Sequence, residues 1–126
     1  MNQKGNINEM TEAVFQAMNS RDFAGLEQII TDDVAFDFPG VGKVEGSRRT
    51  LLLLKSLLRK YPQLHFTISE IISQNDRACA VWTNLGEDNK GRPYANSGIT
   101  LLHFSGNKIK FISDYFKDTS FVESSK

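Results

Sequence analysis

The sequence predicts an α+β domain in which helices cover one face of a curved sheet. In the first half of the chain, apolar residues recur at the three- and four-residue spacing of amphipathic helices. In the second half they form long runs rich in Ile, Val, Phe, Thr and Tyr, separated by short turn segments. A chain of 126 residues with 40% hydrophobic content can bury one core, so we expect a single domain over residues 1–126.

Three helices are expected in the first half of the chain. The first covers residues 7–18, where the apolar side chains share one stripe. A short second helix is predicted for residues 22–31 after a break in the pattern. The third begins at Ser47, a plausible capping residue, presents a row of leucines on one face, and ends before Pro62.

The strands are predicted from period-two alternation and from turn residues. A strand over 34–38 ends at a Pro-Gly turn, and a short return strand follows over 41–44. Four longer strands are expected over residues 63–74, 78–85, 93–104 and 108–117. Because short polar turns separate them, these four should form an antiparallel meander.

Charge and cysteine content narrow the classes of partner. The chain has 15 Lys and Arg against 15 Asp and Glu, so its net charge is zero and neither nucleic acid nor a membrane surface is an expected partner. Cys79 has no second cysteine to pair with, and the first ten residues lack the apolar core of a signal peptide. We therefore expect a cytoplasmic protein.

Three stretches carry a family resemblance: ITDDVAFDFPG at 30–40, VEGSRRTLLLLKSLL at 44–58 and GNKIKFISDYFKDT at 106–119. In this order and spacing, the chain resembles the nuclear-transport-factor-2-like superfamily over residues 7–121. Its similarity is greatest to the SnoaL-like branch, which includes polyketide cyclases. The resemblance implies a cone-shaped, mixed or antiparallel sheet with the three helices on its concave side and a cavity open at one end.

Two chemistries of this superfamily do not match the residues present. Ketosteroid isomerases use two Asp and one Tyr, and the corresponding positions here are Phe38, Thr100 and Val14. Limonene-type epoxide hydrolases need an Arg-x-Asp pair, and the count along the chain places it at Val81 and Thr83. Neither activity is expected.

Asp114 does match a functional position. Polyketide cyclases of the SnoaL type use one Asp there as acid and base, although the His that assists them falls at Thr100 in this chain. A carboxyl group on an apolar cavity wall should have a raised pKa, which favours proton transfer near neutral pH. The residues equally allow a structural role, in which Asp114 only accepts hydrogen bonds.

The remaining predictions concern the cavity and its ligand. The cavity wall is expected to comprise Val14, Phe36, Phe38, Val81, Thr83, Tyr94, Asn96, Gly98, Thr100, Leu102, Ile112 and Phe116. No cofactor is implied, and no residues have metal-ligand spacing. We expect either a cofactor-independent cyclase, isomerase or lyase acting on a small apolar molecule, or a binding or dimerisation module with a vestigial pocket.

The outer face of the sheet is predicted to be apolar. The alternation of the last three strands places Ala80, Trp82, Ile99, Leu101, His103, Ile109, Phe111 and Tyr115 on it. This is more apolar surface than a monomer usually exposes. We therefore expect a homodimer that packs sheet against sheet, mainly through Trp82, Leu101, Ile109, Phe111 and Tyr115.

Overall fold

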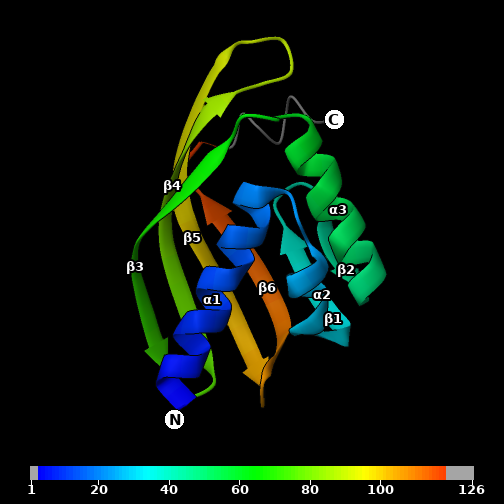
Figure 1. Cartoon of the computed structure of the whole chain (residues 1–126), viewed down its shortest axis with the longest axis vertical. Coiled ribbons are helices and arrows are strands. Elements are labelled where there is room, and N and C mark those ends of the chain that lie inside the picture. Colours follow the sequence, from blue (N-terminus) through cyan, green and yellow to red (C-terminus); the bar gives the residue numbers. More distant parts are fainter. Residues whose placement is uncertain (1–2, 119–126) are drawn as a thin grey trace.

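Six strands form one curved, mixed sheet, and three helices lie on its concave face (Figure 1). This computed structural model describes the backbone of residues 3–118 and the side chains of residues 6–118. The helices are α1 (Gln3–Ser20), α2 (Ala24–Gln28) and α3 (Ser47–Arg59). The strands are β1 (Ile30–Phe38), β2 (Gly42–Glu45), β3 (His65–Gln74), β4 (Arg77–Glu87), β5 (Pro93–Ser105) and β6 (Lys108–Phe116). The α+β class predicted from the sequence is confirmed.

The order of strands across the sheet is β2-β1-β6-β5-β4-β3. Strands β3 to β6 pair antiparallel in chain order, which confirms the predicted meander. Strand β1 then lies parallel to β6, so the first half of the chain completes the sheet formed by the second half. Helix α1 packs over β3 and β4, and α3 packs over β1.

The second helix is shorter than predicted. It ends at Gln28, and Ile30 already belongs to β1, where it pairs with Ile109 and is 2% exposed. The hydrogen bond from the Ile109 amide to the Ile29 carbonyl, 2.7 Å long, fixes this switch from helix to strand. Pairing with a distant strand overrides the local helical pattern here.

The predicted facing of β4 is wrong. Val81 and Thr83 lie on the outer face, where Thr83 is exposed, while Ala80 and Trp82 point inward and are 0% and 4% exposed. Both faces of this strand carry apolar residues, so alternation alone did not decide between them. The pairing of Ala80 with Thr100, whose side chain faces inward, sets the facing of the whole strand.

Ile109 is also on the opposite face from the one predicted. The β5–β6 register shifts between His103 and Phe104, so that His103 pairs with Phe111 but Phe104 pairs with Ile109. This β-bulge turns Ile109 inward, where it is 0% exposed, while Phe111 stays on the outer face. Trp82 and Ile109 therefore cannot contribute to an interface on the outer face.

A row of apolar side chains across the sheet fills one end of the concave face. Phe36, Ile112 and Leu102 are adjacent on β1, β6 and β5, and each is at most 3% exposed.

No helix within residues 3–118 is long and apolar enough to cross a membrane. The predicted core boundary at residue 121 lies outside the described residues.

Candidate functional site

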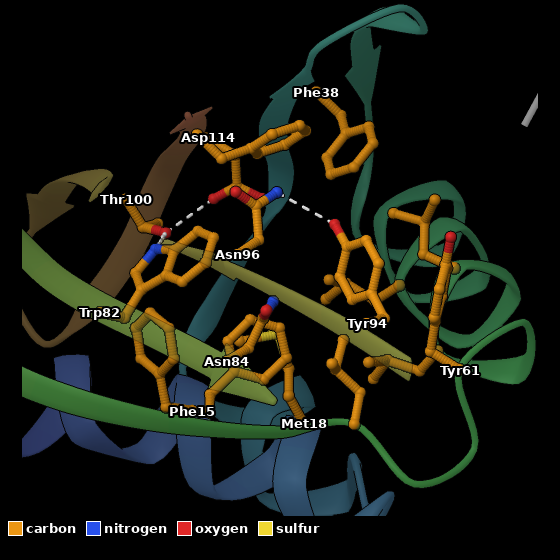
Figure 2. Close-up of a pocket in the computed structure, with 16 residues that line it drawn as sticks. Phe15, Met18, Phe38, Tyr61, Trp82, Asn84, Tyr94, Asn96, Thr100 and Asp114 are labelled. Atoms are coloured by element: carbon orange, nitrogen blue, oxygen red, sulfur yellow. Dashed lines mark hydrogen bonds between the residues drawn. The ribbon is translucent and has the colours of Figure 1, made fainter. Parts of the chain in front are cut away.

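A cavity of about 60 Å³ lies between the helices and the concave face of the sheet (Figure 2). It is lined by Phe15, Met18, Phe38, Leu54, Leu57, Leu58, Tyr61, Leu64, Phe66, Trp82, Asn84, Tyr94, Asn96, Thr100, Asp114 and Phe116. Most of these side chains are apolar and many are aromatic. The side chains in the wall that can form hydrogen bonds are those of Tyr61, Trp82, Asn84, Tyr94, Asn96, Thr100 and Asp114.

A chain of hydrogen bonds connects three cavity residues on neighbouring strands. The Trp82 indole Nε1 donates to Thr100 Oγ1 over 2.9 Å, and Thr100 Oγ1 donates to Asp114 Oδ1 over 2.7 Å (Figure 2). Thr100 and Asp114 are direct cross-strand partners on β5 and β6. Because the hydroxyl has one hydrogen, its orientation is fixed by these two bonds, and Asp114 is held as the acceptor.

The surroundings of Asp114 alter its acidity. Burial among apolar side chains raises the pKa of Asp114 to about 6, and the hydrogen bond from Thr100 opposes this rise. The carboxyl group is partly buried and lines the cavity. Near neutral pH it therefore exists in both protonation states, as a group that accepts and returns a proton must.

Gly98 positions the end of β6, although it does not line the cavity. A Cβ atom at this position would lie 2.2 Å from the Tyr115 carbonyl oxygen and 2.8 Å from the Phe116 Cα. Only glycine allows β6 to approach β5 this closely. Trp82 pairs with Gly98, so its indole meets no side chain there and reaches the next inward residue, Thr100.

Tyr94 and Asn96 form a second polar group in the wall. The Asn96 Nδ2 donates to the Tyr94 hydroxyl oxygen and to the Asp118 carbonyl oxygen, each over 3.0 Å. Asn96 Oδ1 accepts bonds from the backbone amides of Ser97 and Asp118. Burial raises the pKa of Tyr94 to about 12, so its hydroxyl stays protonated and neutral at physiological pH.

Asn84 differs from the other polar residues of the cavity. It is 7% exposed, and its Oδ1 is buried with no hydrogen-bond partner among the described residues. Figure 2 shows its amide pointing into the cavity from the β4 side. The sequence pattern did not single out Asn84, because its facing depends on the register of β4.

Five of the twelve residues predicted to line the cavity do so. Phe38, Tyr94, Asn96, Thr100, Phe116 and the proposed catalytic Asp114 are in the wall. Val14, Phe36, Leu102 and Ile112 are buried in the core, at most 3% exposed. Val14 is on α1 beside Phe15, which does reach the cavity, because a rotation of about 100° separates consecutive helical residues. Val81 and Thr83 are on the outer face.

The sequence analysis missed several cavity residues, because their place in the wall depends on how the helices and β3 pack against the rest of the sheet. Phe15 and Met18 lie three residues apart on α1, and Phe66 is the second residue of β3. The ring of Phe66 packs edge-to-face against Trp82 with centroids 5.3 Å apart, and against Phe15 at 5.9 Å. The row of leucines predicted on one face of the third helix includes Leu54 and Leu58, and it was the signal in the sequence for the part of the wall that α3 contributes.

Comparison with known proteins agrees with this architecture. The model of the family described as the SnoaL-like domain matches residues 11–112. The chain belongs to the SnoaL-like domain family. No curated protein matches this SnoaL-like chain. The inward positions of its β4, Trp82 and Asn84, contain neither Arg nor Asp, so the correction of this strand does not restore the epoxide-hydrolase pair.

Solved structures share this SnoaL-like fold at low sequence identity. An NTF2-like protein of unknown function from Burkholderia pseudomallei has a TM-score of 0.84 and 16% identity, covering 94% of this chain and 95% of that chain. A protein from Jannaschia sp. CCS1 described as a putative SnoaL-like polyketide cyclase has a TM-score of 0.81 and 13% identity, with 90% and 86% covered. A protein of ketosteroid-isomerase-like fold from Catenulispora acidiphila, solved with trimethylamine, has a TM-score of 0.80 and 19% identity, with 90% and 88% covered.

Proposed function

We propose that this SnoaL-like protein is a cofactor-independent proton-transfer enzyme with Asp114 as its acid and base. The observation that carries the proposal is the position of this carboxyl group in the wall of an apolar cavity, where burial raises its pKa to about 6. A base with this pKa is mostly ionised at neutral pH and still basic enough to remove a weakly acidic proton.

The reaction that one carboxyl group supports is an isomerisation or an intramolecular ring closure. Asp114 removes a proton from the carbon beside a carbonyl, and the C–H electron pair forms a C=C bond while the carbonyl oxygen takes the negative charge. In an isomerisation, Asp114 then returns the proton to another carbon of the same molecule and the carbonyl forms again. In a ring closure, the enolate carbon attacks a second carbonyl carbon of the molecule, the π electrons of that C=O move to its oxygen as the C–C bond forms, and Asp114 returns the proton to this oxygen. The proton and the electrons balance without an oxidant or reductant.

The size of the cavity limits the substrate. A volume of about 60 Å³ corresponds to a few water positions, since one water needs roughly 10–15 Å³ on this measure. Phe38 and Phe116, whose rings lie 5.6 Å apart, narrow the space beside Asp114. We infer a compact substrate, about the size of one ring, with a carbonyl group on an apolar body.

A second candidate function is the binding of a small ligand without catalysis. Within the described residues, the ionisable side chains that line the cavity are Asp114, Tyr61 and Tyr94. The rings of Tyr61 and Tyr94 pack with centroids 4.6 Å apart, which favours recognition of an apolar or cationic ligand by aromatic contact. The relative solved with trimethylamine supports such a ligand for this chain too.

Hydrogen exchange separates the two functions. The α-hydrogens of cyclohexanone in D₂O, followed by proton NMR, should exchange faster with wild-type protein than in buffer. Asp114→Asn should lower the protein-dependent rate about 100-fold or more. Asp37→Asn is the control, because it removes the same charge from β1. The side chain of Asp37 lies on the opposite face of the sheet from the buried Phe36 and Phe38, so this substitution should leave the rate unchanged. No acceleration by wild type, or equal rates for wild type and Asp114→Asn, would contradict the enzymatic proposal.

We further propose that the outer face of the sheet pairs with a second copy of this chain. Tyr115 is 54% exposed there, and Leu101 and Phe111 are partly exposed on the same face. An apolar face can pair with its own copy about a two-fold axis. The net charge of zero lets two copies approach without overall repulsion.

A further inference from the structure

Two asparagines sit opposite each other on the concave face, and their hydrogen bonding differs. Asn84 on β4 pairs with Asn96 on β5, and both line the cavity. Both amide atoms of Asn96 are bonded, to Tyr94, Ser97 and Asp118. Asn84 is 7% exposed, and its Oδ1 is buried without a partner in the part of the chain that the structure describes.

An unpaired amide oxygen at this position opposes stability. Burying a polar atom without a hydrogen bond costs free energy, and nearly all such atoms in folded proteins have a partner. Leucine has the same branching at Cγ, with larger methyl groups, and would extend the wall that Leu54 and Leu58 already form, without this cost. A residue that stabilises the fold less than its apolar counterpart, and that points into a cavity, is expected to serve binding.

The hydrogen-bond donors of Trp82 and Thr100 already have acceptors other than Asn84. The Trp82 indole N–H donates its hydrogen bond to Thr100, and the Thr100 hydroxyl donates its hydrogen bond to Asp114. Phe15 and Phe66, the aromatic residues on the α1 and β3 side of the cavity, provide no hydrogen-bonding side-chain group. The Asn84 amide is therefore available to a molecule inside the cavity (Figure 2).

We propose that Asn84 is the polar anchor of the ligand, binding a hydroxyl group of an alcohol, phenol or enol on a compact apolar body. The inference rests on the proposed function, because it assumes that the ligand binds in the same cavity. It adds Asn84 to Asp114 as a second residue that contacts the ligand. Asn84 Oδ1 accepts the hydroxyl hydrogen. A 180° rotation of the amide presents Nδ2–H instead, which donates to the same oxygen when that oxygen carries the negative charge of an enolate.

Phenol and toluene test the anchor, because they differ only in a hydroxyl replaced by a methyl group. The chain contains one tryptophan, and Trp82 lines the cavity, so its fluorescence reports binding of either probe directly. Wild type should bind phenol more tightly than toluene. Asn84→Leu should reduce this preference about tenfold or more, because the hydroxyl loses its partner in a buried site. The same substitution should raise the Tm of the ligand-free protein.

Thr83→Val serves as the matched control, because Thr83 is exposed on the outer face of the same strand. It should change neither the preference for phenol nor the Tm. The inference is overturned if wild type shows no preference for phenol, if Asn84→Leu keeps that preference, or if Asn84→Leu lowers the Tm. A preference lost only in Asp114→Asn would assign the hydroxyl to Asp114 and would also overturn it. The result of the cyclohexanone exchange experiment is independent of this one. That experiment measures the rate of proton removal, whereas this one compares the affinities of the protein for phenol and toluene.

Discussion

At the scale of single residues, burial raises the pKa of Asp114 and Thr100 limits the rise. Its hydroxyl donates to the carboxylate over 2.7 Å and lowers the pKa of Asp114 against the larger effect of burial. Thr100→Val keeps the shape of the side chain and removes this bond, so the pKa of Asp114 should rise above about 6. NMR titration of the Asp114 carboxyl carbon measures the midpoint. Thr83→Val is the control, and an unmoved midpoint in Thr100→Val would contradict this account of the pKa.

Asp114 also makes stability depend on pH. Its pKa is raised to about 6 in the folded protein from about 3.9 in the unfolded chain, so between these values the folded state holds more protons. The free energy of unfolding should fall as pH rises from about 4 to 6, by on the order of 3 kcal/mol, and then level off.

Asp114→Asn removes this titration. The variant should match wild type near pH 4 and exceed its free energy of unfolding at pH 7.5, as measured by urea denaturation at several pH values. Asp37→Asn carries the same change of charge on the opposite face of the sheet. A constant difference between wild type and Asp114→Asn across this pH range would disprove the predicted linkage.

At the scale of elements, one side chain joins α1 to β3. Asn19 Nδ2 donates to the Phe66 carbonyl oxygen over 2.9 Å, and Asn19 Oδ1 accepts from the Phe66 amide over 2.8 Å. The amide thus pairs with the backbone at the start of β3 as a neighbouring strand would. This contact holds the ring of Phe66 against Trp82 in the cavity wall.

Asn19→Ala should lower the free energy of unfolding by about 2 kcal/mol, because two partly buried hydrogen bonds are lost. Urea denaturation measures the change, and Trp82 fluorescence reports whether the wall is disturbed. Gln16→Ala, at an exposed position of the same helix, should have little effect. Equal losses in the two variants would mean that helix propensity, and not the link to β3, explains the change.

At the scale of the whole molecule, the proposed pairing through the outer sheet face predicts a dimer. If this face pairs with a second copy, wild type should sediment as a dimer at micromolar concentration. Tyr115→Glu should shift it to monomer, because it places a charge on the paired surface. Leu52→Glu changes a side chain of similar exposure on α3, 55% against 54%, and should stay dimeric. A monomeric wild type would refute the proposed pairing.

The sequence by itself determined the class of fold and the order of its elements. Helical spacing, period-two alternation and polar turns are local properties, and they predicted the three helices and the four-strand meander that the structure has. The resemblance to the SnoaL-like branch, and not the alternation, singled out Asp114 and Thr100, and the structure has both in the cavity wall.

The tertiary structure alone decided which residues complete the cavity. In β4 both faces are apolar, so pairing with β5 was needed to turn Trp82 and Asn84 inward and Val81 outward. In β6 a bulge reversed the facing of Ile109, and no local pattern marks such a shift. A strand's own residues set its alternation, but its phase depends on hydrogen bonds to a neighbouring strand, and those bonds exist only once the sheet has formed.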